Sequence, residues 1–292
     1  MNRAKWGIEE IAALDELLQL ALMEDIGAGD VTTLALVPEG AIAQADIVFR
    51  QQAVVAGLAA VDQVFQAMDR NILLTPKVYD GDLVEPGVVV ATLQGPARGL
   101  LTGERTALNL LGRLSGIAWT TQQFVQAVAT TQAKIFDTRK TMLGWRTLEK
   151  YAVRAGGGNN HRQGLFDAVL IKDNHLAFGG NTLYTPAQAV QRSRESVPTG
   201  TVVEIEVDTL DQFREVLPVH PDIVLLDNMT NDQLRQAVVL RNNSYPDILL
   251  EASGGVSLHT VEQIAQTGVD RISVGSLTHS APWLDVGLDW QS

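Results

Sequence analysis

The sequence predicts an α/β protein built around a (β/α) barrel, with a smaller companion region before it. Three observations lead to this prediction. The chain has 292 residues, which suits a barrel that carries a companion domain. After residue 133, short apolar runs alternate with helical patterns, and each run ends in polar or glycine residues.

Composition excludes several classes of protein. Hydrophobic residues make up 46% of the chain and charged residues 19%, so a large core forms and wholesale disorder is excluded. A net charge of −12 argues against a protein that binds nucleic acids or anionic membranes in general. The chain has no cysteine, which excludes disulfides and thiolate sites. The N-terminus lacks the pattern of a secretory signal and no apolar run is of bilayer length, so we expect a soluble, cytoplasmic protein.

The first 130 residues mix helices and short strands. Apolar residues at Ile11, Leu14, Leu18 and Leu22 predict an amphipathic opening helix, which stops in the turn formers 27–30. Residues 41–102 then show β-type segments separated by turn signals, namely AQADIVF, AVVAGL, LLTPKVY and VVVATLQG. The stretch from Thr102 to Val128 has helical spacing again and predicts one or two helices.

Six apolar runs in the second half predict parallel strands covered on both faces, because helical patterns separate most of them. The runs are KIFDT (134–138), AVLIK (168–172), VVEIEV (202–207), DIVLLDN (222–228), ILLEASGG (248–255) and RISVG (271–275). Their polar ends would meet at one mouth of a barrel, where active sites lie. Eight strands are standard, so we expect an incomplete barrel or strands that the pattern does not reveal. No G-x-G-x-x-G motif opens a helix, which leaves a dinucleotide fold without support.

A basic cluster lies between residues 134 and 172, where eight cations stand against three acids. The four-residue spacing of Arg146, Lys150 and Arg154 favours a solvated helix face. Arg139, Lys140 and Lys172 instead lie at strand ends, where burial would be costly without an anionic partner. We therefore expect a carboxylate or phosphate ligand at these cations.

Three further groups surround this predicted mouth. The segment GGGNNHR ends in His161 and Arg162 and is either a ligand-binding loop or a flexible connection. Glu206 and Asp227 end two runs, where they would hold Mg²⁺, accept hydrogen bonds from sugar hydroxyls, or pair with the barrel's own lysines. Glu204 shares a strand face with Glu206, so spacing does not decide which of the two points into the mouth.

Glycine-containing turns follow the last two runs and predict a phosphate site, because glycine lets backbone N–H groups approach the oxygens closely. The residues concerned are Ser253, Gly254, Gly255, Gly275 and Ser276. The residues alone thus predict a barrel enzyme for a small, phosphorylated, multiply anionic substrate. They do not name the reaction, and a Schiff-base lyase using Lys172 stays open.

At these same residues the sequence resembles the quinolinate phosphoribosyltransferase family. The resemblance covers nearly the whole chain, and its most specific part is the block DTRKTMLGWRTLEKYAVRAGGGNNHRQGLFDAVLIKDNH (137–175). Further matches are EDIGAGDVTT (24–33), GPARGLLTGERTALNLLGRLSGIA (95–118), VEIEVDTL (203–210), LLDNM (225–229), EASGG (251–255) and ISVGSLTHSAP (272–282).

The resemblance implies a two-domain subunit. An N-terminal α/β sandwich domain would span 1–115 and be joined by the tail 278–292, and an incomplete α/β barrel would span 116–277. It also implies a homodimer whose active site is shared between subunits, while further assembly into hexamers is left open. The implied reaction transfers the phosphoribosyl group of phosphoribosyl pyrophosphate to quinolinate with Mg²⁺. Its products are nicotinate mononucleotide, CO₂ and pyrophosphate, in NAD synthesis.

The resemblance also assigns roles. Arg139, His161, Arg162 and Lys172 would surround the quinolinate carboxylates, with Arg105 arriving from the neighbouring subunit. Thr138 and Lys140 belong to the same binding segment, and Lys140, Lys172, Glu206 and Asp227 would take part in catalysis. Glu206, favoured over Glu204, and Asp227 would face the ribose and Mg²⁺, directly or through water. The 5′-phosphate would lie against Ser253, Gly254, Gly255, Gly275 and Ser276.

The nearest alternative is a phosphoribosyltransferase of the same fold with a different acceptor. The complete set of cations argues against it, because a monocarboxylate needs fewer. A non-catalytic nucleotide- or phosphate-binding protein is disfavoured by the presence of both Glu206 and Asp227.

Overall fold

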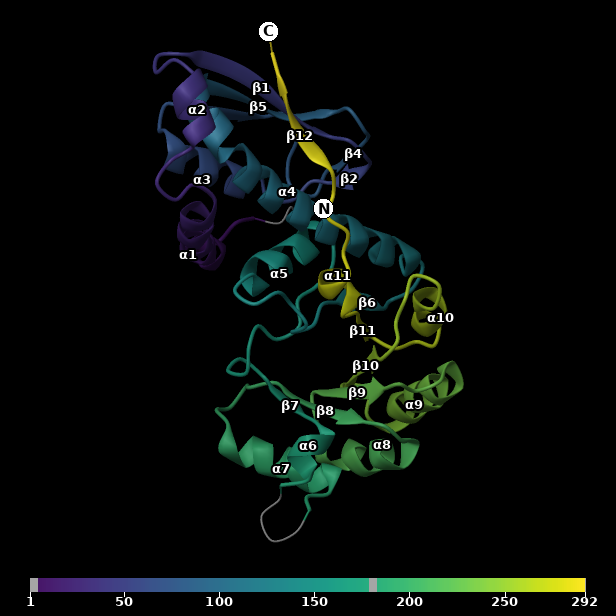
Figure 1. The fold of residues 1–292 in the computed structure, drawn as a ribbon. Coiled ribbons are helices and arrows are strands. Elements are labelled where there is room, and N and C mark those ends of the chain that lie inside the picture. The colour runs from purple at the N-terminus through teal and green to yellow at the C-terminus, as the bar shows by residue number, and fades with distance from the viewer. Residues whose placement is uncertain (1–4, 179–182, 292) are drawn as a thin grey trace. The chain divides into compact units, whose positions relative to one another are not determined.

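The computed structural model describes residues 5–178 and 183–291, which form two compact units (Figure 1). Unit 1 comprises residues 1–122, 141–157 and 277–292, and unit 2 comprises residues 123–140 and 158–276. Unit 1 is therefore assembled from three separate stretches of chain. No helix in the described ranges combines the length and apolar character that crossing a membrane requires.

Unit 1 contains a four-stranded antiparallel sheet in the order β12-β1-β5-β3. These strands are β1 (Ile42–Phe49), β3 (Leu73–Pro76), β5 (Val89–Pro96) and β12 (Val286–Trp290). The short strands β2 (Ala53–Val54) and β4 (Leu83–Val84) form a separate ladder. Figure 1 shows the yellow strand β12, from the end of the chain, beside β1. The last strand of the chain thus completes the sheet that the first strand began.

The helices of unit 1 are α1 (Ile8–Asp25), α2 (Val31–Leu36), α3 (Leu58–Met68), α5 (Arg146–Ala155) and most of α4 (Ala97–Ala127) and α11 (Ser276–His279). Asp30 begins α2, where its carboxylate accepts hydrogen bonds from the backbone N–H groups of Thr32 and Thr33 at 3.1 and 2.9 Å. Asp80 likewise accepts the N–H groups of Gly57 and Leu58 at the start of α3. Side-chain acceptors therefore satisfy the first N–H groups of two helices.

The chain returns to α4 after α11 (Ser276–His279) and packs its backbone closely against that helix. A Cβ atom at Gly116 would lie 1.9 Å from the carbonyl oxygen of Pro282, so only glycine fits there. Arg113 holds the same segment, because its guanidinium donates to the carbonyl oxygens of Thr278 and Ala281 and pairs with buried Glu149 at 2.6 Å.

Unit 2 contains a six-stranded, all-parallel sheet in the order β6-β11-β10-β9-β8-β7. The strands are β6 (Lys134–Phe136), β7 (Val169–Ile171), β8 (Val203–Val207), β9 (Ile223–Asp227), β10 (Leu249–Ser253) and β11 (Arg271–Ser273). All six runs predicted from the sequence form these strands. Within the described ranges the sheet stays open between β6 and β7, as a partial barrel does.

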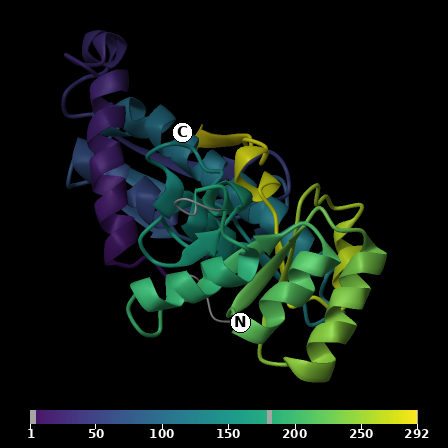
Figure 2. The ribbon, with the colours of Figure 1, turned by 90° about the horizontal axis from the view of Figure 1, so that it is seen from below.

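Helices connect successive strands in unit 2. They are α6 (Asp173–Leu176), α7 (Pro186–Ser196), α8 (Leu210–Val216) with the 3₁₀ turn η1 (Leu217–Val219), α9 (Asn231–Ser244) and α10 (Val261–Ala265). Figure 2 shows α7, α8 and α9 side by side along the sheet. Each crossover buries one face of the sheet, and each leaves the carboxyl ends of the strands along one edge.

Two expectations need correction, and a third is narrowed. The stretch AVVAGL is a strand only over Ala53–Val54, and its last residue, Leu58, begins the unpredicted helix α3. The prediction of one or two helices over 102–128 is narrowed to one, because α4 runs without a break to Ala127. The solvated face predicted for Arg146, Lys150 and Arg154 is wrong at Lys150, which is 1% exposed because α5 is buried from Leu148 to Val153. Arg154 is partly exposed and pairs with Glu10 of α1.

We expect Gly116→Ala to destabilise the protein. Alanine favours a helix over glycine by about 1 kcal/mol, but the added methyl group would meet the Pro282 carbonyl. The net result should be a loss of about 2 kcal/mol in the free energy of unfolding, measured by urea denaturation. Asn109→Ala, at an exposed position of the same helix, is the control and should leave that energy unchanged or slightly raised. A Gly116→Ala protein as stable as wild type would contradict the close packing.

Candidate active site

Unit 2 holds a pocket of about 320 Å³ at the carboxyl edge of its sheet. Six of the residues singled out from the sequence line it, namely Thr138, Arg139, Lys140, His161, Arg162 and Lys172. Leu170, Leu225, Glu251 and Ser273 complete the lining. A larger cavity of about 690 Å³ shares Arg139, Arg162 and Lys172 with it and extends along β7 and α7. Basic side chains from three separate segments therefore converge on one concave site, as an anionic ligand requires.

Buried Asp137 joins two of these segments. It follows β6 directly, and its side chain accepts a hydrogen bond from the backbone N–H of His161 at 2.8 Å and from the amide of Asn160 at 2.6 Å. Asn159 also forms an isolated parallel β-bridge with Phe136. The end of the glycine segment is thus a fixed extension of the sheet, which brings Arg162 beside Arg139.

The guanidinium of Arg162 is hydrogen-bonded at one nitrogen and lacks an acceptor at another. Its Nη1 donates to the carbonyl oxygen of Ala168 at 3.0 Å, whereas its buried Nε finds no hydrogen-bond acceptor among the described residues. Burial and the positive charge of Arg139 lower the pKa of Arg162. A bound carboxylate or phosphate would stabilise such a buried donor, because it would accept the hydrogen bond and offset the repulsion from the neighbouring positive charge.

The two predicted acids have partners in this structure. Glu206, near the end of β8, pairs with Lys172, as the alternative reading of the sequence proposed for it. Asp227, at the end of β9, accepts a hydrogen bond from the side-chain amide of Asn228 at 2.7 Å. Glu206 lies opposite Leu225 in the register, so Asp227 follows two residues later on the neighbouring strand. Both carboxylates therefore lie at the same edge of the sheet.

The turn after β10 is shaped by tight packing. Gly254 and Gly255 have φ angles of 97° and 59°, and Asn228 has a φ of 52°. A Cβ at Gly254 would lie 2.1 Å from the side-chain oxygen of Asn228, whose N–H donates to Ser253. These contacts tie the predicted phosphate turn to the end of β9. Gly275 and Ser276 follow β11 on the next strand along the sheet.

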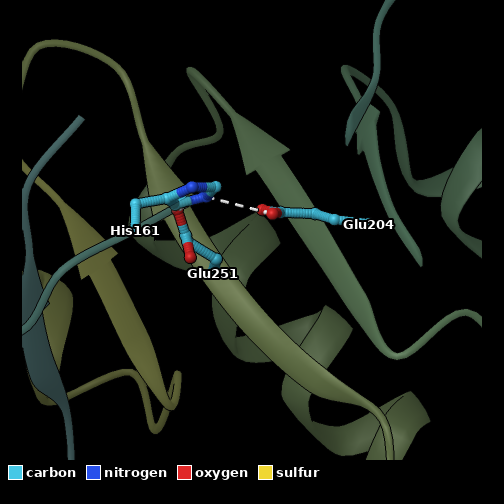
Figure 3. Close-up of side chains that lie close together, drawn as sticks. All are labelled: His161, Glu204 and Glu251. Carbon is cyan, nitrogen blue, oxygen red and sulfur yellow. Dashed lines mark ion pairs between the residues drawn. The ribbon is translucent and has the colours of Figure 1, made fainter. Parts of the chain in front are cut away.

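Beneath the pocket lies a group of four charged or titratable residues, here named the floor cluster: His161, Glu204, Glu251 and Arg271. Figure 3 shows Glu204 and Glu251 pointing toward the His161 ring from β8 and β10. His161 Nε2 lies 3.0 Å from Glu204 Oε2 and 3.5 Å from Glu251 Oε1. Glu251 Oε2 lies 2.6 Å from Arg271 Nε, and the Arg271 guanidinium stacks 3.8 Å above the Phe136 ring.

The charges of the floor cluster act on one another. Burial and the neighbouring charge of Glu204 raise the pKa of Glu251. Burial works to lower the pKa of His161, but the hydrogen bond to Glu204 and the charges of both carboxylates outweigh it and raise that pKa. The ligand atoms lie within 4.8 Å of one another, a spacing that a metal ion also accepts. Arg271 already supplies positive charge to Glu251 from inside the cluster, so the cluster is compensated by protein groups.

Sequence reasoning missed Asp137, Glu251 and Arg271 as parts of the site. The available signal was a charged residue in or beside an otherwise apolar strand, which indicates a paired group inside the barrel. Arg105 is not among the residues that line this pocket; it lies on α4 in unit 1 and is exposed. Its role stays a prediction.

Comparisons with known proteins cover almost the whole chain. The family models for the N-terminal and C-terminal domains of quinolinate phosphoribosyl transferase match residues 30–115 and 117–289. The nicotinate-nucleotide pyrophosphorylase (carboxylating) of Mycobacterium leprae is 45% identical over 96% of this chain and 98% of its own. The probable enzyme of that name from Bacillus subtilis is 42% identical over 94% and 93%. The structure of the Francisella tularensis nicotinate-nucleotide pyrophosphorylase is similar over both full chains, with 35% identity and a TM-score of 0.91.

We expect Gly254→Ala to weaken the binding of inorganic phosphate, because the new methyl group would displace Asn228 and open the turn. Calorimetric titration with phosphate measures this directly. Gly200→Ala is a matched control in the same unit. Its φ of 91° costs alanine a similar ~1–2 kcal/mol of backbone strain, but no atom lies within 4 Å of the added Cβ. Equal phosphate affinity in both variants would show that the turn does not bind the anion.

Proposed function

The chain belongs to the quinolinate phosphoribosyltransferase family, and we propose that the pocket of unit 2 is where it carries out the reaction of that family. The enzyme transfers the phosphoribosyl group of phosphoribosyl pyrophosphate to quinolinate, and the products are nicotinate mononucleotide, CO₂ and pyrophosphate. The observation that carries the assignment to this pocket is the convergence of Arg139, Lys140, Arg162 and Lys172 on one small cavity.

Quinolinate would occupy the cationic part of the pocket. It carries two adjacent carboxylates, and the planar fork of arginine matches a carboxylate with two donors. Arg139 and Arg162 would bind these groups, with Lys172 and His161 beside them. The buried Nε of Arg162 supports this placement, because a substrate carboxylate would satisfy it. A phosphoribosyltransferase with a monocarboxylate acceptor would leave part of this charge unpaired.

Phosphoribosyl pyrophosphate would lie along the ends of β8 to β11. The turns at Ser253–Gly255 and Gly275–Ser276 offer backbone N–H groups to the 5′-phosphate. Glu206 and Asp227 would face the ribose hydroxyls. Glu206 pairs with Lys172 in this structure, so binding of both substrates would exchange partners: Lys172 turns to a substrate anion and Glu206 turns to the sugar. The exchange keeps both charges compensated.

Glu206 and Asp227 also fit a Mg²⁺ ion. Mg²⁺ is held by one or two carboxylates together with substrate phosphates, and these two carboxylates end neighbouring strands at one edge. When bound, Mg²⁺ supplies positive charge that stabilises the departing pyrophosphate. The ion would be held by these two residues directly or through water.

The chemistry then follows from orientation and charge. The pyridine nitrogen attacks the anomeric carbon while the bond to pyrophosphate breaks, and positive charge builds on the ribose. Glu206 and Asp227 would stabilise that charge. The ring nitrogen of the adduct is quaternary, so the carbon–carboxylate bond next to it breaks with its electron pair kept on the ring carbon, which then takes a proton. Lys140 lies on the pocket wall, where it would orient the anionic groups.

A shared site between two copies of the chain forms part of this proposal. Arg105 is exposed on unit 1, and several large apolar side chains of α1 and α2 are exposed as well, which supports an interface there. They are Ile8, Leu20, Met23, Val31, Leu34 and Leu36. We place the enzyme in the cytoplasm as a homodimer, and fractionation of cells that express the tagged chain tests the location.

We expect Arg139→Ala to lower kcat/KM for quinolinate by about a hundredfold, equivalent to about 3 kcal/mol, because a carboxylate of the substrate would lose its charged partner. The assay incubates the protein with quinolinate, phosphoribosyl pyrophosphate and Mg²⁺ and follows CO₂ and nicotinate mononucleotide. Arg235→Ala on the exposed face of α9 removes the same charge away from the pocket and should act like wild type. Near-parental turnover of Arg139→Ala at low quinolinate would refute the assignment.

A mixing experiment tests the shared site. Arg105→Ala and Arg139→Ala should each be nearly inactive alone, since each lacks one cation of every site. After mixing and subunit exchange, each mixed dimer regains one intact site, so roughly a quarter of wild-type activity should return. If Arg105 served its own subunit, no activity would return on mixing, and size-exclusion chromatography would establish whether mixed dimers had formed.

A further inference from the structure

Apart from His161, the residues of the floor cluster have no role in the proposed reaction, although their charges are costly to bury. Glu204 is 1% exposed and Glu251 is 0% exposed, and both lie inside the partial barrel. Burying a carboxylate costs several kcal/mol before its partners compensate it, and apolar residues of similar size are often as stable. A stable core alone therefore does not require these charges.

The hydrogen bonds of His161 show what the floor cluster holds in place. The backbone N–H of Arg162 donates to His161 Nδ1 at 2.8 Å, so Nδ1 acts as an acceptor and carries no proton. The ring proton is then on Nε2, which faces Glu204 at 3.0 Å. The backbone N–H of His161 itself donates to Asp137. His161 is thus a link between a buried carboxylate and the backbone of a substrate-binding arginine.

Glu204 is the member of the floor cluster best placed to orient this ring. Glu251 is further from Nε2, at 3.5 Å, and its other oxygen is engaged by Arg271 at 2.6 Å. Glu204 and Glu206 point to the same face of β8, but Glu204 lies two residues deeper. The deeper carboxylate meets His161, and the outer one meets Lys172 at the mouth.

We propose that Glu204 is a positioning residue of the acceptor pocket: it holds the His161 ring so that Nδ1 accepts the Arg162 N–H, and it thereby aims the Arg162 guanidinium at the substrate carboxylate. This inference rests on the proposed binding of quinolinate at Arg162. Arg162 is fixed at two points, its N–H on His161 and its Nη1 on Ala168, while its buried Nε has no hydrogen-bond acceptor among the described residues. Loss of the first point would let the arginine turn away.

The test compares three variants in steady-state kinetics. Glu204→Ala removes the acceptor, and we expect the KM for quinolinate to rise about tenfold or more while the KM for phosphoribosyl pyrophosphate stays within about twofold. Glu204→Asp keeps the charge but withdraws the oxygen by one methylene group, and it should raise the quinolinate KM by less. Glu204→Gln keeps an oxygen that accepts from Nε2–H and should restore a KM near that of wild type.

A spectroscopic signature separates positioning from a general loss of structure. Nitrogen-15 NMR of histidine-labelled protein should show His161 as the Nε2–H tautomer in wild type and in Glu204→Gln, and as a mixture of ring states in Glu204→Ala. The chain has five histidines, and His161→Gln identifies the signal. Glu149→Ala is the matched control, because Glu149 is likewise buried, at 0% exposed, and its carboxylate pairs with a basic side chain, Arg113, but in unit 1. It should lower stability without a selective change in the quinolinate KM.

Two outcomes would overturn the inference. One is an unchanged quinolinate KM in Glu204→Ala and Glu204→Asp. The other is a loss of kcat with both KM values moving together, as expected of a purely structural residue. Glu204→Asp keeps the test decisive if Glu204→Ala does not fold. Arg162→Ala separates the positioning role of Glu204 from the proposed binding of quinolinate at Arg162. If Arg162→Ala leaves the quinolinate KM unchanged, the proposed acceptor site itself is wrong.

Discussion

Crowding of positive charge at the carboxyl edge of a parallel sheet is the constraint on which the rest of unit 2 depends. Parallel strands deliver their ends to one edge, and here those ends and the adjoining loop carry Arg139, Lys140, Arg162 and Lys172. Two like charges 4 Å apart repel by about 4 kcal/mol at an effective dielectric constant of 20. Positive charges gathered at one edge are therefore unfavourable unless anionic groups lie nearby. Carboxylates of the neighbouring strands supply such groups.

Carboxylates at two depths of the partial barrel offset the positive charge of the pocket. The floor cluster supplies two carboxylates from below, where one is matched by Arg271 and the other faces His161. Glu206 neutralises Lys172 at the rim. The Nε of Arg162 is buried without a hydrogen-bond acceptor among the described residues, and in the proposed reaction a substrate carboxylate would lie beside this guanidinium. In the proposed reaction a doubly charged acid would stabilise this group of cations, since each ion pair formed would offset repulsion between like charges as well as make a contact.

The sheet of unit 2 was predictable because buried parallel strands are continuous apolar runs, and the polar residues that end them indicate the mouth. The helix α3 was not, because Leu58 extends the apolar run AVVAGL and nothing local separates strand from helix there. Spacing placed Lys150 on a helix face but could not tell what packs on that face. Spacing also could not decide whether Glu204 or Glu206 lies at the mouth of the barrel, because residues two apart in a strand share a face. Only their depth along the strand distinguishes them. The assembly of unit 1 from three separate stretches depends on contacts between distant residues, which no local pattern encodes.

The pairing of β12 with β1 has a consequence for how the chain matures during translation. The strand β1 leaves the ribosome early, yet its neighbour on one side is residues 286–290, which follow every strand of unit 2 in the sequence. Every strand of unit 2 is synthesised before that neighbour exists, so the barrel can condense while one edge of the first sheet still waits, exposed to pairing with foreign strands. Nascent chains of this enzyme would accordingly benefit from protection of that edge until residues 286–290 have emerged, and a premature stop before residue 286 would leave the edge permanently open.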